Sequence, residues 1–152
     1  MILSGDHVYK MDYSLFLGYH RENNADATIA VIEQRKELAG DYGVLEVDEG
    51  FEVKGFQEKP LNPRTIPGDS SGILASMGIY LFKTEVLLRM LKKDDKADFG
   101  KHILPDMLER HRVMAYPYRA RNRIRDAIVK TDKDGLRTES IVEKARDSGY
   151  WR

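Results

Sequence analysis

The spacing of hydrophobic and polar positions predicts strands alternating with helices along most of this chain. Segments 26–33 and 76–82 are rich in apolar and β-branched residues and predict buried strands. The first is apolar on both faces and is therefore expected at the centre of its sheet. Apolar positions at helical spacing predict helices over 13–21, 85–93 and about 102–110.

Local signals mark the ends of these elements. Asp12 and Thr84 are predicted helix caps, because their side-chain oxygens can accept hydrogen bonds from N–H groups of the first turn. Residues 1–6 have the pattern of a buried strand that ends in a turn, so we expect the chain to begin inside an element. A further short strand is predicted over 112–116.

A hairpin is predicted in the middle of the chain. Two alternating segments, 42–47 and 51–57, flank a glycine-containing turn at 48–50. Pro60 ends the second arm, since proline cannot donate a hydrogen bond to a neighbouring strand. The segment 61–72 is rich in Pro, Gly and Ser and is a predicted loop. Strands, helices and an inserted hairpin together indicate an α/β sheet of mixed direction.

The last part of the chain is different in composition. Residues 119–152 are dense in charge and poor in apolar residues, so we divide the chain into a domain at 1–118 and a charged C-terminal segment at 119–152. A polar start followed by apolar residues predicts one short amphipathic helix over 138–145. The segment starts with four alternating arginines: Arg119, Arg121, Arg123 and Arg125. They suit either the binding of an anionic ligand or a solvated charged face.

Composition limits the kinds of function. The 152 residues are 41% hydrophobic and 33% charged, as in a soluble globular protein. Lys plus Arg (25) equal Asp plus Glu (25), so no nucleic-acid partner is expected. The absence of cysteine excludes disulfides, thiolate metal sites and cysteine nucleophiles. No apolar run reaches the roughly 18 residues that span a bilayer, and no secretion signal is present. We therefore expect a cytoplasmic protein without a membrane partner.

Three segments carry side chains that suit phosphate and sugar chemistry. Asp6 follows the first predicted strand, where open α/β sheets place their ligands, and its carboxylate could bind Mg²⁺ together with substrate phosphates. At the end of the hairpin, Lys59 can pair with a phosphate while Glu58 accepts sugar hydroxyl protons. Ser76 precedes Gly78 inside a strand, where glycine marks the close approach of a ligand or of another backbone.

Each segment also has a purely structural interpretation. Asp6 can cap the turn that follows it, and Glu58 and Lys59 can form a solvated ion pair. From residue types alone, these interpretations are the better supported ones. For the 76–80 strand, tight packing without a ligand is equally compatible with the pattern. The sequence has no nucleophile elbow and no Walker loop. Its four histidines do not have the spacing of metal ligands: His7, His20, His102 and His111.

The order of the segments is more informative than any one of them. Over about 1–118 the chain resembles the bacterial and plant ADP-glucose pyrophosphorylases, and YWR at 150–152 resembles a further segment of that family. SGDHVYKMDY and SMGIY are specific to this group, whereas FQEKP is shared more widely among sugar nucleotidyltransferases. The matching segments are SGDHVYKMDY, ADATIAVIE, YGVLEVDEGFEVKGFQEKP, PGDSSGILASMGIYLF, DFGKHILPDMLE and RVMAYPY.

The resemblance implies a Rossmann-like nucleotidyltransferase fold, a mixed sheet flanked by helices, here truncated at both ends. Residues 1–118 would be part of a catalytic domain. The implied reaction converts ATP and glucose 1-phosphate into ADP-glucose and pyrophosphate, with Mg²⁺ as cofactor, in glycogen or starch biosynthesis. We expect a homo-oligomer or a domain completed by another subunit, because a truncated sheet exposes an edge.

The resemblance also implies roles for individual residues. Asp6 would be the catalytic aspartate associated with Mg²⁺. Lys59 would hold the phosphate of glucose 1-phosphate, with Glu58 on the sugar hydroxyls. Gly43 and Ser76 would line the same pocket.

Some parts of the family pattern have no match in the chain. These are the glycine-rich nucleotide loop, an upstream stretch that holds the glucose, the aspartate after YWR and the C-terminal β-helix; the 119–149 segment is also longer than the family's connection. We therefore expect no measurable ADP-glucose synthesis from the chain alone. The alternatives are a non-catalytic module that binds a sugar phosphate or another subunit, and a transferase for a different hexose 1-phosphate or base.

Overall fold

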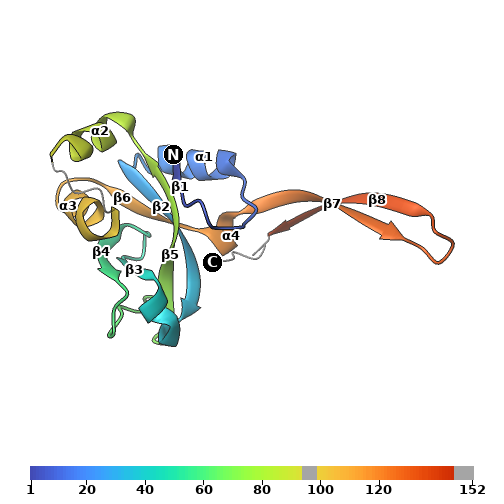
Figure 1. The fold of residues 1–152 in the computed structure, drawn as a ribbon, viewed down its shortest axis with the longest axis horizontal. Coiled ribbons are helices and arrows are strands. Elements are labelled where there is room, and N and C mark those ends of the chain that lie inside the picture. Colours follow the sequence, from blue (N-terminus) through green and yellow to red (C-terminus); the bar gives the residue numbers. More distant parts are fainter. Residues whose placement is uncertain (94–98, 146–152) are drawn as a thin grey trace.

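The computed structural model describes residues 1–93 and 99–145, which form a mixed sheet flanked by helices and a separate two-stranded hairpin (Figure 1). The elements are β1 (Ile2–Leu3), α1 (Tyr13–Glu22), β2 (Ala27–Arg35), η1 (Lys36–Asp41), β3 (Gly43–Val47), β4 (Val53–Glu58), β5 (Gly72–Phe82), α2 (Thr84–Lys93), η2 (Phe99–Ile103), α3 (Leu104–Leu108), β6 (Val113–Pro117), α4 (Tyr118–Arg121), β7 (Arg123–Thr131) and β8 (Arg137–Ala145). Among the described helices, none is long and apolar enough to cross a membrane.

The main sheet has the order β4-β3-β5-β2-β6, and β1 also pairs with β5. Only the β2–β6 pair is parallel among these neighbours; the others are antiparallel. The central position predicted for the 26–33 strand is confirmed, since β2 lies between β5 and β6 and is buried from Ala27 to Ile32.

Apolar side chains cover both faces of the sheet. On one face, Phe16 and Tyr19 of α1 pack with Tyr116 of β6, and both rings meet the Tyr116 ring edge-on at 5.1 and 5.3 Å between centroids. On the other face, Val86 of α2 and Met107 of α3 pack against the sheet. The strands alternate between these two clusters, as expected for a sheet buried on both sides.

The local signals for α1 and for the β3–β4 hairpin are confirmed. Asp12 is the N-cap of α1, and its carboxylate accepts a hydrogen bond from Ser14 N at 2.8 Å. In the hairpin turn, Asp48 Oδ1 accepts from Gly50 N and Glu52 N, both at 2.9 Å. The turn is longer than the predicted 48–50, because Phe51 takes a positive φ of 62° before β4 begins.

Some predicted boundaries are wrong. Strand β5 begins at Gly72 rather than at 76, because β2 continues to Arg35 and pairs with the whole stretch. The first strand is not buried, since Leu3 is 45% exposed. The helix predicted over 102–110 is the shorter α3, preceded by the π-helical turn η2. Asp98, the first residue of the DFGKHILPDMLE segment, and the YWR segment lie outside the described residues.

The amphipathic helix predicted over 138–145 is wrong, because these residues lie in strand β8, which pairs with β7 along its whole length. The turn between them explains the difference. Asp132 Oδ1 accepts hydrogen bonds from Asp134 N and Leu136 N at 2.9 Å, and Gly135 takes a φ of 81°. Asp134-Gly135 is a standard hairpin-turn dipeptide, and it is the signal that the helical interpretation overlooked.

The charged segment joins the sheet through α4. Tyr118 is buried, and its hydroxyl donates to Lys10 O at 2.6 Å. Asn122 is also buried; its amide donates to Lys10 O at 2.8 Å and accepts from Asp12 N at 3.0 Å. These bonds tie the loop before α1 to the start of the hairpin, while the hairpin itself projects away from the sheet (Figure 1). The domain division at 118 remains a prediction.

A buried histidine joins α1 to the sheet. His20 Nδ1 lies 2.8 Å from Thr28 Oγ1, and both side chains are buried. Burial and the nearby Lys83 lower the pKa of His20 below its usual 6.5. In the unfolded chain the ring regains its normal pKa. The folded protein therefore binds fewer protons than the unfolded chain as the pH falls through about 6.5.

His20→Gln is expected to flatten the pH dependence of stability. Between pH 7 and 5 the free energy of unfolding should fall more steeply in the wild type than in the variant. The difference between the two slopes should be at most about 1.4 kcal/mol per pH unit. Urea titrations at several pH values measure it. Above pH 7 the two slopes should agree, since His20 is neutral in both states; equal slopes between pH 7 and 5 would contradict the assignment.

Candidate functional site

The candidate site lies where strand β5 lacks a partner on one edge. Along this edge, β3 pairs at Leu74 and Ala75, and β1 pairs at Ile79 and Tyr80. On this edge, no strand in the described part of the chain pairs with the three residues between them. A pocket of about 380 Å³ opens over this gap, and its walls come from β1, the start of β3, the end of β4, β5 and η2. The lining residues are Ile2, Leu3, Ser4, His7, Asp41, Tyr42, Gly43, Phe56, Glu58, Lys59, Ser76, Gly78, Tyr80, Phe99 and Gly100.

A bulge in β5 shapes the floor of this pocket. Ile29 pairs with Tyr80 and Val31 pairs with Ser76, so one residue of β2 faces three residues of β5. Gly78 lies in this bulge with a φ of 67°, a conformation that side chains disfavour. A Cβ atom at Gly78 would lie 3.1 Å from the ring of His7. The glycine thus marks the close approach of another chain segment.

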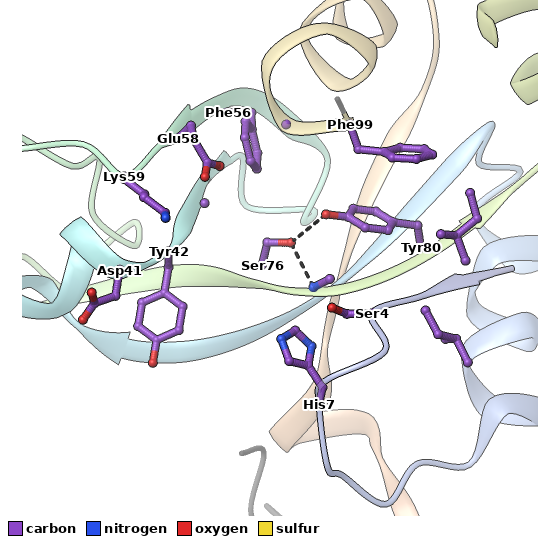
Figure 2. A pocket seen from close by; sticks show the side chains of 15 residues that line it. Ser4, His7, Asp41, Tyr42, Phe56, Glu58, Lys59, Ser76, Tyr80 and Phe99 are labelled. Atoms are coloured by element: carbon purple, nitrogen blue, oxygen red, sulfur yellow. Dashed lines mark hydrogen bonds between the residues drawn. The ribbon is translucent and has the colours of Figure 1, made fainter. Parts of the chain in front are cut away.

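Glu58 and Lys59 lie at the opposite wall, and both point into the space over Ser76 (Figure 2). Lys59 has a φ of 46°, which is strained for a residue other than glycine. Its N–H donates to Tyr42 O at 3.0 Å and so fixes the end of β4 against the start of β3. Strain of this kind can occur at functional sites, but Asn24 and Phe51 also take a positive φ in this chain, so a functional role for Lys59 stays a prediction.

Two glycines make room for the wall that carries Glu58. A Cβ atom at Gly43 would lie 2.5 Å from the Phe56 ring, and one at Gly100 would lie 3.2 Å from it. The same two positions lie 3.3 and 3.1 Å from Glu58 Oε2. Gly43 therefore contributes to the pocket by its missing side chain, which lets Phe56 and Glu58 sit where they do.

Polar and aromatic groups of β5 complete the pocket. Ser76 Oγ accepts a hydrogen bond from Gly78 N at 3.3 Å and lies 3.5 Å from the Tyr80 hydroxyl (Figure 2). The Tyr80 ring stacks on Phe99, with 5.6 Å between centroids and 17° between planes. The pocket thus combines an apolar wall with a small set of polar groups, as small-molecule sites do.

Asp6 does not line the pocket itself, but its contacts with the lining residues Ser4 and His7 put it at the pocket rim. Its carboxylate accepts a hydrogen bond from Ser4 Oγ at 2.8 Å, and His7 Nε2 lies 3.4 Å from the same oxygen. The Asp6 side chain is 80% exposed, so a cation can reach it. Among the described residues, no group of three or more His, Asp or Glu side chains could hold a metal ion. A single carboxylate beside a phosphate pocket nevertheless fits Mg²⁺, which commonly takes one or two carboxylates plus phosphate and water oxygens.

The structure brings four of the five predicted site residues into one pocket: Gly43, Glu58, Lys59 and Ser76. Their roles remain predictions, as does that of Asp6 at the rim. Sequence reasoning missed His7, Tyr80 and Phe99. His7 was considered only for metal-ligand spacing, and the ring pair needs the fold, since Phe99 is far from Tyr80 in sequence.

Comparison with known proteins agrees with this fold. Residues 1–152 match the nucleotidyl transferase family, and the chain belongs to that family. The resemblance to ADP-glucose pyrophosphorylases is also confirmed. The chain is 49% identical to the glucose-1-phosphate adenylyltransferase of Shewanella baltica (strain OS155 / ATCC BAA-1091) and 48% identical to that of Shewanella sp. (strain ANA-3), each over 126 residues. These matches cover 79% of the chain but only 30% of either relative.

The strain at Lys59 predicts an unusual order of stabilities. Lys59→Gly should be more stable than Lys59→Ala by about 1 kcal/mol in the free energy of unfolding, because glycine adopts a positive φ at little cost. Urea titration compares the two variants. At Lys54, an exposed strand position, the order should be reversed, with Lys54→Gly less stable than Lys54→Ala by about 0.5–1 kcal/mol. The same order at both positions would show that Lys59 is unstrained.

Proposed function

We propose that this pocket binds glucose 1-phosphate and that the chain is the sugar-phosphate part of a glucose-1-phosphate adenylyltransferase. The observation that carries the proposal is the placement of Glu58 and Lys59 over Ser76, in a pocket whose other wall is aromatic. The names of the relatives in Shewanella support the same substrate. The chain spans 30% of their length, so the reaction of the whole enzyme is part of the proposal.

The pocket groups match the parts of a sugar phosphate. Lys59 supplies a point charge for the phosphate, and Glu58 accepts hydrogen bonds from sugar hydroxyls. Ser76 can donate or accept through its hydroxyl. The volume of about 380 Å³ is within the usual range for small-molecule sites. The rings of Tyr80 and Phe99 offer the apolar surface on which a bound ring can rest.

In the proposed reaction, an oxygen of the sugar phosphate attacks the α-phosphorus of ATP and pyrophosphate leaves. The protein contributes mainly by position and charge, as in other phosphoryl and nucleotidyl transfers. Lys59 holds the attacking phosphate, and Glu58 orients the sugar. Asp6 is the residue that would hold Mg²⁺, which when bound neutralises phosphate charge.

The proposal extends to the setting of the reaction. It places the enzyme in the cytoplasm, in glycogen or starch biosynthesis, with ATP as the second substrate. It also includes an assembly of several copies or a partner subunit. The support for this part is the similarity to the curated adenylyltransferases.

One observation favours the alternative of a subunit-interaction module. The β7–β8 hairpin projects from the sheet (Figure 1). Val129, Leu136 and Ile141 are exposed on it. A two-stranded hairpin with no further strand against it is only marginally stable in water. A partner that covers the hairpin would stabilise it, and this role is compatible with binding of a sugar phosphate in the pocket.

Calorimetric titration of the folded chain with glucose 1-phosphate tests the proposed substrate. Lys59→Ala should weaken binding about 10- to 100-fold, because a hydrogen bond to a charged group contributes about 1.5–3 kcal/mol. Lys54→Ala is the matched control, since Lys54 is exposed on the same strand as Glu58 and pairs with Asp48 and Glu52 instead. Glucose without phosphate should bind equally weakly to wild type and Lys59→Ala.

Two results would contradict this proposal. One is a wild-type protein that is folded, as judged by its cooperative unfolding, and shows no heat of binding with glucose 1-phosphate. The other is an affinity that Lys59→Ala leaves unchanged. With the first result, the interaction-module interpretation becomes the better one.

A further inference from the structure

The loop after β1 contains a histidine that neither the fold nor the proposed reaction accounts for. The His7 side chain is only 10% exposed, although Asp6 beside it is 80% exposed. His7 lines the pocket, and its Nε2 lies 3.4 Å from Asp6 Oδ1. We propose that His7 is a positioning residue, seated against Gly78, that orients the Asp6 carboxylate for Mg²⁺ at the rim of the pocket. This inference rests on the function proposed above.

Two of the contacts around Asp6 act on the same oxygen. Ser4 Oγ donates to Oδ1 at 2.8 Å, and His7 Nε2 approaches the same atom. An exposed aspartate in a loop can take several rotamers, and fixing one of them costs conformational entropy. The contacts of Ser4 and His7 with Oδ1 restrict the Asp6 rotamer in the metal-free protein, so less conformational entropy is lost when a cation binds. Groups that hold a metal-binding side chain in this way usually matter for metal affinity.

The seat of His7, which is the space beside Gly78 that its ring fills, depends on the bulge in β5. The bulge adds two residues between Tyr80 and Ser76, and it bends the strand at Gly78. Ser4 N donates to Gly78 O at 3.0 Å, so the loop is fastened to the bulge. A Cβ atom at Gly78 would lie 3.1 Å from His7 Cε1 and 3.2 Å from Ser4 Cβ. The bulge and the glycine therefore place Ser4 and His7, which contact Asp6 Oδ1.

A second His–Asp pair in the protein shows how a purely structural pair differs. His111 Nδ1 lies 3.3 Å from Asp26 Oδ2, but the Asp26 side chain is only 22% exposed. Asp26 also accepts from Lys83 Nζ at 3.0 Å and from Arg112 N at 3.1 Å. Burial alone would raise the pKa of Asp26, but these bonds outweigh it and lower the pKa. Asp26 is thus enclosed by its partners, whereas the Asp6 carboxylate is open to solvent at the pocket rim.

The test uses Mn²⁺ as the probe for the Mg²⁺ site and needs no turnover. Mn²⁺ binding to the full chain with saturating glucose 1-phosphate is measured by water-proton relaxation, and glucose 1-phosphate binding without metal is measured by calorimetry. His7→Leu fills the seat but cannot contact the carboxylate. It should weaken Mn²⁺ binding about 10-fold or more, as loss of groups that support metal ligands does. Its metal-free affinity for glucose 1-phosphate is measured in parallel, because His7 also lines the pocket, and the fold-loss of Mn²⁺ affinity should exceed any fold-loss of sugar-phosphate affinity.

Matched variants separate positioning from folding. His7→Gln keeps a donor and should restore Mn²⁺ affinity to within about threefold of the wild type. Gly78→Ala should weaken Mn²⁺ binding as His7→Leu does, since its methyl group would lie 3.1 Å from the His7 ring and displace it. Ser4→Ala removes the other contact to Oδ1 without changing the seat, and should also lower Mn²⁺ affinity. His111→Asn alters the structural pair and should leave Mn²⁺ affinity unchanged.

The outcomes distinguish this inference from the proposed function. A wild type that binds no glucose 1-phosphate contradicts the proposed function itself. If the wild type binds both ligands, wild-type Mn²⁺ affinity in His7→Leu overturns the positioning role. If His7→Leu does not fold, Ser4→Ala and His7→Gln provide the test. The positioning role is supported if Ser4→Ala binds Mn²⁺ more weakly than the wild type while His7→Gln binds it almost normally. Wild-type Mn²⁺ affinity in Ser4→Ala would overturn it.

Discussion

The pairing of β5 on its two edges is the constraint on which the rest of the site depends. On one edge, β2 runs alongside the whole strand, and this buried pair places the apolar side chains of both faces. On the other edge, two short strands share the same neighbour and leave a gap between Ala75 and Ile79. A polar pocket can open in the middle of the sheet because the backbone there is not covered by a strand. The predicted pocket residues Gly43 and Ser76 lie in β3 and β5, whereas Glu58 and Lys59 come from the end of β4, which pairs with β3.

Absent side chains are as important to this site as present ones. Gly43 and Gly100 leave space for the Phe56 ring, and Gly78 leaves space for His7. Lys59 does the reverse, since it keeps a full side chain in a conformation that suits glycine better. The pocket therefore concentrates close backbone approach and local strain in a small region, while the two apolar faces of the sheet supply the stability that holds it.

Much of the fold could be predicted from the chain, because apolar periodicity and caps act locally. The pattern around Asp12, the apolar stretch of β2 and the β3–β4 hairpin are examples. The pocket residues were also found, but through the order of motifs rather than through their chemistry, which gave Glu58 and Lys59 no advantage over a surface ion pair. The gap beside β5 and the seat of His7 follow from the register of distant strands, which local patterns do not contain. The β7–β8 hairpin was missed because the apolar spacing after Thr138 suits a helix as well, and the Asp134-Gly135 turn was not given enough weight.

The size of the bulge in β5 has a consequence for how this segment can change in length. Because it adds two residues, an even number, the side chains before and after it keep the same alternation: Ala75 and Ile79 lie in one apolar cluster, and Leu74 and Phe82 lie in the other. Removing or inserting a single residue would exchange the two faces on one side of the bulge, turning buried positions toward the wrong layer. Changes of two residues would preserve the faces. Homologous chains are therefore expected to vary in length here by even steps.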